Sequence, residues 1–119
     1  MGGRGDGPDD RRRTVVNVPQ QGEIWWAEAE DKRRPVLVVT RNEAISVLSS
    51  IIVAPVTRTV RNIPTEIALG VHHGLSSVCA ASFDNLQPIR RASLTIRVGR
   101  LGIDELEEIC RAIRALADC

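Results

Sequence analysis

Aromatic side chains are scarce in this sequence, which contains two tryptophans, one phenylalanine and no tyrosine. Proteins that bind single-stranded nucleic acid by stacking place successive bases on aromatic rings. Three rings are too few for such a platform, so any nucleic acid bound by this chain has to be held mainly by polar groups. Trp25 and Trp26 are neighbours on a predicted strand, which places one in the core and the other at the surface or a subunit contact.

Cysteine is also rare, and the motifs of several enzyme classes are missing. Cys79, Cys110 and Cys119 are far apart and form no CxxC or Cys/His spacing, so neither a disulfide framework nor a zinc site is expected. The adjacent His72 and His73 are predicted to lie in a polar loop. No GxxxxGKS/T, GxGxxG, HExxH or GxSxG motif occurs, which gives no support to a phosphate-loop ATPase, a dinucleotide enzyme, a zinc peptidase or a serine hydrolase. We expect neither a metal nor a cofactor.

Long apolar runs are missing as well. No segment approaches the roughly 20 apolar residues of a membrane-spanning helix, and the N-terminal MGGRGDGPDD lacks the apolar region of a secretory signal. The sequence therefore predicts a cytoplasmic protein. Its formal net charge is +1, which argues against a protein held to nucleic acid by bulk electrostatics. The charge is uneven, because residues 21–103 contain ten Lys/Arg and seven Asp/Glu, whereas residues 104–118 contain two arginines and five acids.

The chain of 119 residues is long enough for one domain with its own core. Residues 1–20, rich in Gly, Pro and Asp with an RRR run, are interpreted as a flexible arm, with attraction of RNA as the alternative. The folded domain is predicted over residues 21–119. Short β-branched segments separated by Gly, Pro, Asn and Asp predict a mainly β small barrel of about six to seven strands. The expected strands are residues 22–29, 35–41, 50–59, 64–69, 76–83 and 94–101.

Two helices are predicted beside the strands. The segment NEAISVL is expected to form a short helix with Asn42 as its N-cap. Residues 102–119 are predicted to form an amphipathic helix, because acids crowd the first turns and apolar residues recur on one face. We expect this face to pack on the barrel or on a partner. Its members are Leu106, Ile109, Cys110, Ile113 and Leu116.

Polar side chains occur where apolar strands begin or end. Arg34 is held extended by the following proline, and its guanidinium can donate to a phosphate bidentately. Thr57 ends the apolar segment IIVAPVT, while Asp84 and Asn85 follow CAASF. Each feature also has an ordinary structural interpretation, as an ion-paired arginine, a strand threonine and an Asp-Asn turn. Composition and periodicity alone thus indicate a small β-barrel with a helix and an anion-binding capability.

The order and spacing of five segments resemble the MazF/PemK/Kid family of toxin endoribonucleases. These segments are GEIWWAE, RRPVLVVTRN, IIVAPVTRTVRNIPTEIAL, SSVCAASFDNLQPIRRASL and VGRLGIDELEEICRAI, and they cover about residues 21–117. The resemblance implies an SH3-like barrel, a homodimer, and an antitoxin protein that blocks the site. It also implies sequence-specific, metal-independent cleavage of single-stranded RNA (mRNA, rRNA or tRNA), leaving a 2′,3′-cyclic phosphate and a 5′-hydroxyl and so inhibiting translation and growth.

Carried over to this chain, the resemblance implies that Arg34 and Thr57 are catalytic. Asp84 matches an aspartate proposed as the base in the PemK/Kid branch, but Ser82 stands where that branch has an arginine two positions earlier. Amides can read base edges, whereas arginines bind phosphate without regard to sequence. The candidates for RNA contact are Arg33, Arg58, Arg61, Asn85 and Gln87. If the chain is extended here, Arg33 points the opposite way from Arg34.

Two other functions stay open at this point. A non-catalytic toxin of the same fold, such as the CcdB-type gyrase poisons, acts by binding. Those toxins depend on a C-terminal Trp-Gly-Ile, whereas this chain ends RALADC. A degenerate toxin would bind RNA or the antitoxin without cutting, and the serine at position 82 is the feature that favours this alternative.

Overall fold

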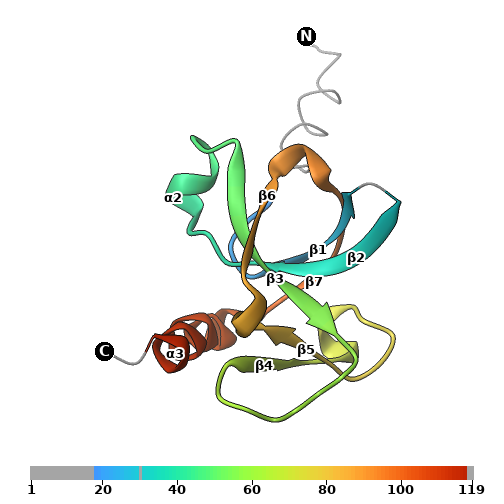
Figure 1. Cartoon of the computed structure of the whole chain (residues 1–119), viewed down its shortest axis with the longest axis vertical. Helices are drawn as coiled ribbons and strands as arrows, with labels where there is room; N and C mark the ends of the chain where they lie inside the picture. The colour runs from blue at the N-terminus through green and yellow to red at the C-terminus, as the bar shows by residue number, and fades with distance from the viewer. Residues whose placement is uncertain (1–17, 30, 118–119) are drawn as a thin grey trace, which may run out of the picture.

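The computed structural model describes residues 18–29 and 31–117, and most of the predicted arm at residues 1–20 lies outside them. Seven strands within these ranges form one curled sheet of order β4-β5-β3-β2-β1-β7, with β6 paired to β3 (Figure 1). The strands are β1 Glu23–Ala29, β2 Lys32–Val38, β3 Ser50–Thr57, β4 Glu66–Leu69, β5 Cys79–Ser82, β6 Gln87–Arg90 and β7 Leu94–Arg100. The predicted small, SH3-like β-barrel with a C-terminal helix is confirmed.

Strand β3 causes much of the curl, because its two halves have different partners. Residues 50–53 pair with β6, residues 56–57 pair with β5, and residues 53–55 pair with β2 along the opposite edge. β1 adds to the curl, since its pairing with β7 is interrupted by register shifts at Ile24/Trp25 and Trp26/Ala27. Such bulges increase the local twist of a strand. The sheet therefore wraps around its own side chains.

The alternation of side chains along the strands produces two clusters of buried residues. Ile24, Leu37 and Phe83 belong to the cluster that faces α3, while Trp25 and Val36 belong to the other. Burying a side chain of this size contributes about 1.5–3 kcal/mol. Trp25 is 1% exposed, and Trp26 is partly exposed on the opposite face, as the sequence predicted.

A buried carboxylate connects the first strand to its neighbours. Glu23 accepts hydrogen bonds from the Trp25 indole Nε1 (2.9 Å) and the Gln20 backbone N–H (2.8 Å). Its second oxygen forms an ion pair with Arg97 of β7 (3.0 Å). These bonds offset the cost of burying the carboxylate. They also join the Gly-Glu-Ile-Trp segment to Gln20 and to β7, which fixes the start of the domain.

The short helix after β2 is present, but its predicted cap is wrong. Helix α2 spans Asn42–Ile45 and its N-cap is Arg41, without a side-chain capping bond. Asn42 is the first helical residue, and its Oδ1 accepts the Gln21 backbone N–H at 2.7 Å. The asparagine therefore ties α2 to the chain entering β1, a long-range contact that a capping pattern does not reveal.

The predicted C-terminal helix is divided in two. A 3-10 turn, η4, covers Ile103–Glu105, and α3 covers Glu107–Leu116. The barrel buries Ile109 and Ala112, whereas three members of the predicted apolar face, Cys110, Ile113 and Leu116, are exposed. None of the helices in the described part of the chain is long and apolar enough to cross a bilayer.

Two strand boundaries differ from the prediction in a way that affects the site. β2 begins at Lys32, so Arg33 and Arg34 lie inside a hairpin with β1 instead of at the mouth of a strand. β6 was not predicted at all, because Pro88 interrupts its pattern and proline demotes a strand assignment. It nevertheless pairs along the edge of β3, with Gln87 opposite Val53.

Candidate nucleic-acid cleft

A cavity of about 1230 Å³ opens between β2, the end of β3, the β3–β4 loop and the 3-10 turn η2 Phe83–Asn85. All the residues predicted for catalysis or RNA contact line this cavity, which we call the cleft. They are Arg33, Arg34, Thr57, Arg58, Arg61, Asp84, Asn85 and Gln87. The fold thus brings together three separate segments that the sequence had singled out, residues 33–34, 57–61 and 84–87.

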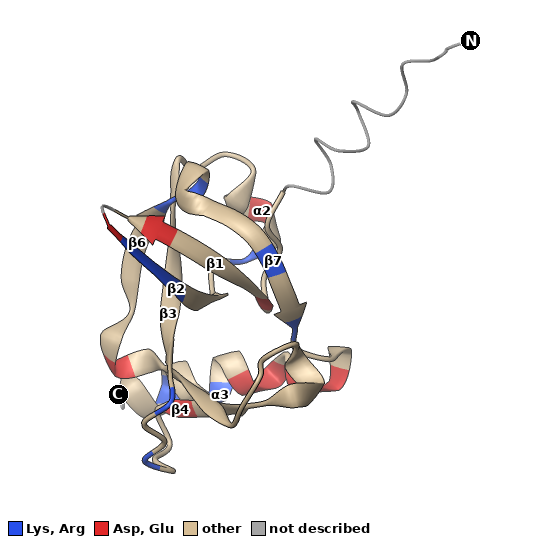
Figure 2. Ribbon diagram, turned by 90° about the vertical axis from the view of Figure 1, so that its right-hand side faces the viewer, with Lys and Arg blue, Asp and Glu red and all other residues tan. Residues whose placement is uncertain are grey.

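The two adjacent arginines reach the cleft from opposite faces of β2. The guanidinium carbon of Arg33 lies 4.9 Å from the ring centroid of Trp26, and its Nε is 3.7 Å from a carboxylate oxygen of Glu28. Arg34 pairs across the hairpin with Ala27 and lines both the cleft and a neighbouring hollow. Figure 2 shows the resulting block of positive charge on the first half of β2.

Thr57 is the last residue of β3 and presents its hydroxyl at the cleft. Its Oγ1 accepts the Thr59 backbone N–H at 3.0 Å, which fixes the first turn of the β3–β4 loop. A threonine hydroxyl has one proton and two lone pairs, so this bond leaves the proton available for an acceptor. Thr57 can therefore act as a hydrogen-bond donor in the cavity that Arg33 and Arg34 also line.

The β3–β4 loop forms one wall of the cleft, and the side chains of Glu66 and Arg111 bind its backbone. The carboxylate of Glu66, a residue only 6% exposed, accepts the backbone N–H groups of Arg61 (3.0 Å) and Asn62 (3.1 Å). Asn62 has a positive φ of 55°, a conformation that asparagine tolerates. From α3, Arg111 donates to the carbonyls of Pro64 (2.7 Å) and Glu66 (2.9 Å). These contacts fix the loop that carries the cleft arginines Arg58 and Arg61.

The residues after β5 form a second set of contacts. The Thr65 hydroxyl donates to Oδ2 of Asp84 at 2.6 Å. The amide of Asn85 donates to Oγ of Ser82 at 2.9 Å, and Ser82 is buried. Ser82, which stands where the PemK/Kid branch of the family that the sequence resembles has an arginine, is thus a buried acceptor for Asn85 and does not supply a cation to Asp84.

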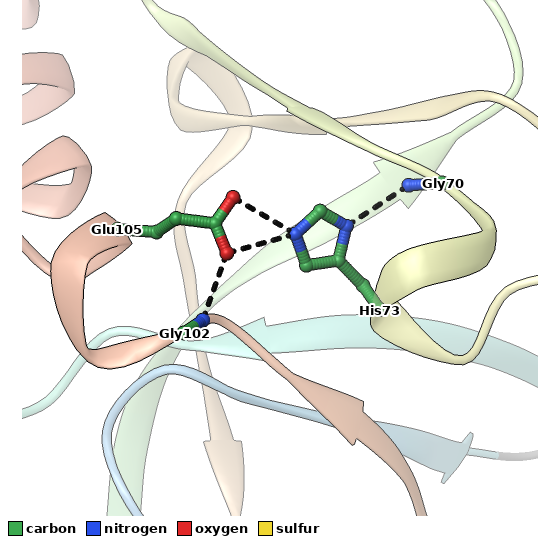
Figure 3. A network of polar contacts seen from close by, with 4 residues as sticks. All are labelled: Gly70, His73, Gly102 and Glu105. Carbon is green, nitrogen blue, oxygen red and sulfur yellow. Dashed lines mark hydrogen bonds and ion pairs between the residues drawn. The ribbon is translucent and has the colours of Figure 1, made fainter.

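Residues 74–77 form another wall of the cleft, and the preceding His73 is buried, whereas the sequence predicted a polar loop for both His72 and His73. The side chain of His73 is 9% exposed, accepts the Gly70 N–H at Nδ1 (3.1 Å) and donates through Nε2 to Glu105 (3.1 Å; Figure 3). The Gly102 N–H, and next the His73 donor, lower the pKa of Glu105. This network joins the 3-10 turn η1 Val71–His73 to η4, and the chain after η1 lines the cleft.

Glycine is required beside this histidine. A Cβ on Gly99 would lie 1.8 Å from the His73 carbonyl oxygen, and Gly74 has a φ of +90° while facing the Val98 carbonyl. Sequence reasoning missed both the network and these contacts. His73 and Glu105 are 32 positions apart, so no local pattern connects them.

Comparison with known proteins identifies the family. The chain matches the model of the PemK-like, MazF-like toxin of type II toxin-antitoxin systems over residues 20–117. The chain belongs to the PemK/MazF family. The matched range contains every cleft residue named above, so the cleft is part of the PemK/MazF domain itself.

Individual PemK/MazF relatives match over nearly their whole length. The Mycobacterium tuberculosis protein named "Probable endoribonuclease MazF5" is 37% identical over 109 residues, which are 88% of this chain and 98% of that relative. The solved M. tuberculosis toxin MazF-mt6 superposes with a TM-score of 0.74 at 34% identity, covering 81% of this chain and 96% of the other. A chain of the MazE-MazF structure from Deinococcus radiodurans gives a TM-score of 0.69 at 26% identity, covering 84% and 95%.

Proposed function

We propose that this chain is the toxin of a toxin-antitoxin pair and an endoribonuclease that cuts single-stranded RNA in the cleft. The observation that carries this proposal is the convergence of Arg34 and Thr57, with three further arginines, in one cavity of a PemK/MazF domain. Relatives that match the chain over most of its length are named endoribonucleases. The activity inhibits translation and growth by destroying RNA.

The proposed reaction is a transesterification followed by release. The ribose 2′-oxygen attacks the adjacent phosphorus, the P–O2′ bond forms and the P–O5′ bond breaks. The 2′-hydroxyl loses its proton and the departing 5′-oxygen gains one, which leaves a 2′,3′-cyclic phosphate and a 5′-hydroxyl. Because the nucleophile is the 2′-hydroxyl, RNA is cut and DNA is not.

Arg34 and Thr57 are assigned to the phosphate. Negative charge builds on the two non-bridging oxygens as phosphorus becomes five-coordinate, and fixed donors stabilise that charge by about 3 kcal/mol each in comparable oxyanion sites. A guanidinium stays protonated at physiological pH and suits a phosphate bidentately. We therefore assign charge stabilisation, not proton transfer, to Arg34, with the Thr57 hydroxyl as the second donor. These two donors provide the stabilisation without a metal ion.

The remaining cleft residues are assigned to RNA binding. Arg33, Arg58 and Arg61 carry charges that attract the phosphates before and after the cut. Asn85 and Gln87 carry amides that can read base edges. The cut is expected to be sequence-specific for that reason.

The proposed partners follow from the family. A protein antitoxin is proposed to occupy the cleft in the cytoplasm until it is removed, and solved relatives include MazE-MazF structures. We also propose a homodimer. Light scattering after size exclusion should then give about twice the 13.0 kDa of the chain, about 26 kDa. A mass of one chain at micromolar concentration would contradict the dimer.

The decisive experiment incubates the purified full-length chain, freed of antitoxin, with several long RNAs in EDTA and maps the cut ends. We expect cuts with cyclic-phosphate and 5′-hydroxyl ends. Replacing either donor, as in Arg34→Ala or Thr57→Val, should lower kcat about 10²–10³-fold. Arg114→Ala, which removes an exposed arginine of α3, serves as the matched control and should cut normally.

Two results of this experiment would count against the proposal. If the unmodified chain cuts none of the RNAs, the enzyme assignment fails and a binding toxin takes its place. If Arg34→Ala cuts as fast as the unmodified chain, the ribonuclease remains but the assignment of Arg34 fails.

A further inference from the structure

A second hollow of about 390 Å³ lies beside the cleft, among strands β1, β2 and β6. Two residues, Arg34 and Gln87, line both this hollow and the cleft. The other residues that line it are Ala27, Ala29, Lys32, Val36, Pro88 and Ile89. The two cavities therefore border each other at the arginine that the proposed function places on the phosphate. We call the smaller cavity the β1–β2–β6 hollow.

The hollow is open because small residues stand opposite long ones. Across the β1–β2 hairpin, Ala27 is opposite Arg34 and Ala29 is opposite Lys32. Val36 is buried beneath, within the same cluster as Trp25. The walls consequently combine an aliphatic surface with two cations along one side.

This combination suits one building block of a nucleic acid. Ligand pockets in proteins have volumes of about 300–1,000 Å³, with mainly apolar walls and a few placed polar groups. The aliphatic floor can contact the face of a base or a ribose, the Gln87 amide can pair with a base edge, and Lys32 can meet the following phosphate. The hollow has the chemistry of a nucleoside site with a flanking phosphate.

We propose that the β1–β2–β6 hollow binds one of the two nucleosides joined by the phosphate that is cut. The inference rests on the proposed function, since it takes Arg34 as the phosphate ligand. A phosphodiester joins two nucleosides, and Arg34 borders two cavities. One strand can therefore lie with one neighbouring nucleoside in the cleft and the other in the hollow. Continuity with the cleft favours RNA over an acidic peptide as the occupant.

The test fills the hollow without changing a proposed catalytic residue. Ala29 is exposed on β1, and Ala29→Trp would place an indole in the hollow. Ala68 is an exposed alanine of β4 that lines neither cavity, so Ala68→Trp is the matched control. Once the cut position is mapped, kcat/KM is measured on the intact RNA and on RNAs in which the nucleotide just before or just after the cut is replaced by an abasic ribose.

For the unmodified chain and Ala68→Trp, we expect removal of the base that lies in the hollow to lower kcat/KM about tenfold. For Ala29→Trp this tenfold cost should disappear for the base on one side of the cut, whereas the effect of removing the other base should be unchanged. If removal of each base costs as much in Ala29→Trp as in the unmodified chain, the proposal is overturned and the endoribonuclease stands. No cutting by the unmodified chain would refute the proposed function, and the hollow assignment with it.

A second variant tests the cation of the hollow. Lys32→Gln should raise KM for the intact RNA with little change in kcat, and should reduce the magnitude of the slope of log K against log salt by about 0.7. Arg114→Gln is the control and should leave the slope unchanged. If an antitoxin peptide loses affinity for Lys32→Gln while the RNA does not, the hollow belongs to the peptide and the proposal is wrong.

Discussion

At the scale of the residue, the role of Asp84 is the most informative open question. Its Oδ2 accepts a hydrogen bond from the Thr65 hydroxyl at 2.6 Å. This bond connects the β3–β4 loop to the turn after β5. A general base needs a free lone pair directed at the 2′-hydroxyl, and it contributes about 10²–10⁴-fold to the rate. Oδ1 keeps its lone pairs, but the contact that Asp84 makes joins two parts of the fold, so we infer a positioning role for Asp84.

The first prediction follows from this contact. Asparagine can still accept the Thr65 hydroxyl through its carbonyl oxygen, so Asp84→Asn should keep cleavage within about tenfold, whereas a lost base would cost about 10²–10⁴-fold. The pH profile of kcat should not change. Thr65→Val removes the contact that asparagine keeps, so it should lower cleavage more than Asp84→Asn does. A loss of 10²-fold or more in Asp84→Asn, with the acid limb of the profile removed, would make Asp84 the base.

The residues of the cleft were predictable from sequence to the extent that their chemistry is local. Polar groups at strand ends indicated an anion site, and the resemblance singled out Arg34 and Thr57. All of them line one cavity. The supporting contacts were not predictable, because Glu66 and His73 act on backbone N–H groups and on residues of distant segments. Outside recurrent motifs such as helix caps, a side chain that binds backbone atoms leaves no sequence pattern.

At the scale of the element, the β3–β4 loop depends on one carboxylate. The second prediction is that Glu66→Ala lowers the free energy of unfolding by about 1–3 kcal/mol, because two backbone N–H groups lose their acceptor. Without this carboxylate the loop is no longer fixed, so its arginines should also bind RNA more weakly. Urea unfolding and RNA titration measure the two effects. Glu66→Gln keeps one acceptor oxygen and should lose less than Glu66→Ala.

An exposed acid serves as the control for this prediction. Glu107 lies on the first turn of α3. Glu107→Ala should change stability by less than about 0.5 kcal/mol, as surface substitutions usually do. If Glu66→Ala is as mild as this control, the loop does not depend on the carboxylate.

The third prediction concerns the network between η1 and η4. The pKa of Glu105 is lowered from its ordinary value of 4.5 by the Gly102 N–H and by His73. The folded state therefore binds this proton less readily than the unfolded state, and stability is gained above pH 4.5 and lost as the pH falls through the lowered pKa. Because the Glu105 side chain is 41% exposed, we expect less than about 1 kcal/mol.

The measurement compares the unmodified chain with Glu105→Gln in urea at several pH values. The difference in stability between the two should be fully present above pH 4.5 and should shrink as the pH falls through the lowered pKa of Glu105. A difference that grows as the pH falls would contradict the assignment. Asp104→Asn, an exposed neighbour in the same turn, should show a smaller pH dependence.

Element boundaries were predicted less well than element types, for two physical reasons. β2 and β6 were misjudged because strand pairing overrides local composition: Lys32 to Arg34 pair with β1, and the segment containing Pro88 pairs with β3. On α3, periodicity identified an apolar face but not what covers it. The barrel covers Ile109 and leaves Ile113 38% exposed.

At the scale of the whole molecule, charge is distributed in a way that the net value hides. The formal net charge is +1, yet the cleft contains four arginines, Arg33, Arg34, Arg58 and Arg61. A single strand that is neutralised at Z phosphates loses affinity with a log–log salt slope of about −0.7Z. Binding should therefore respond to salt as if the protein were far more basic than its composition indicates.

The last prediction is the salt dependence of RNA binding. An RNA with a 2′-deoxy nucleotide at the cut site binds without being cut, and its affinity can be measured from 50 to 200 mM salt. The four cleft arginines should contribute about −3 to the slope for each protomer, and the double variant Arg58→Gln/Arg61→Gln should reduce the magnitude of the slope by about 1.5. Arg114→Gln should leave the slope unchanged, because its charge lies on α3 outside the cleft. A slope near zero in the unmodified chain would mean that amides and apolar contacts hold the RNA, and the cleft arginines would then need another partner.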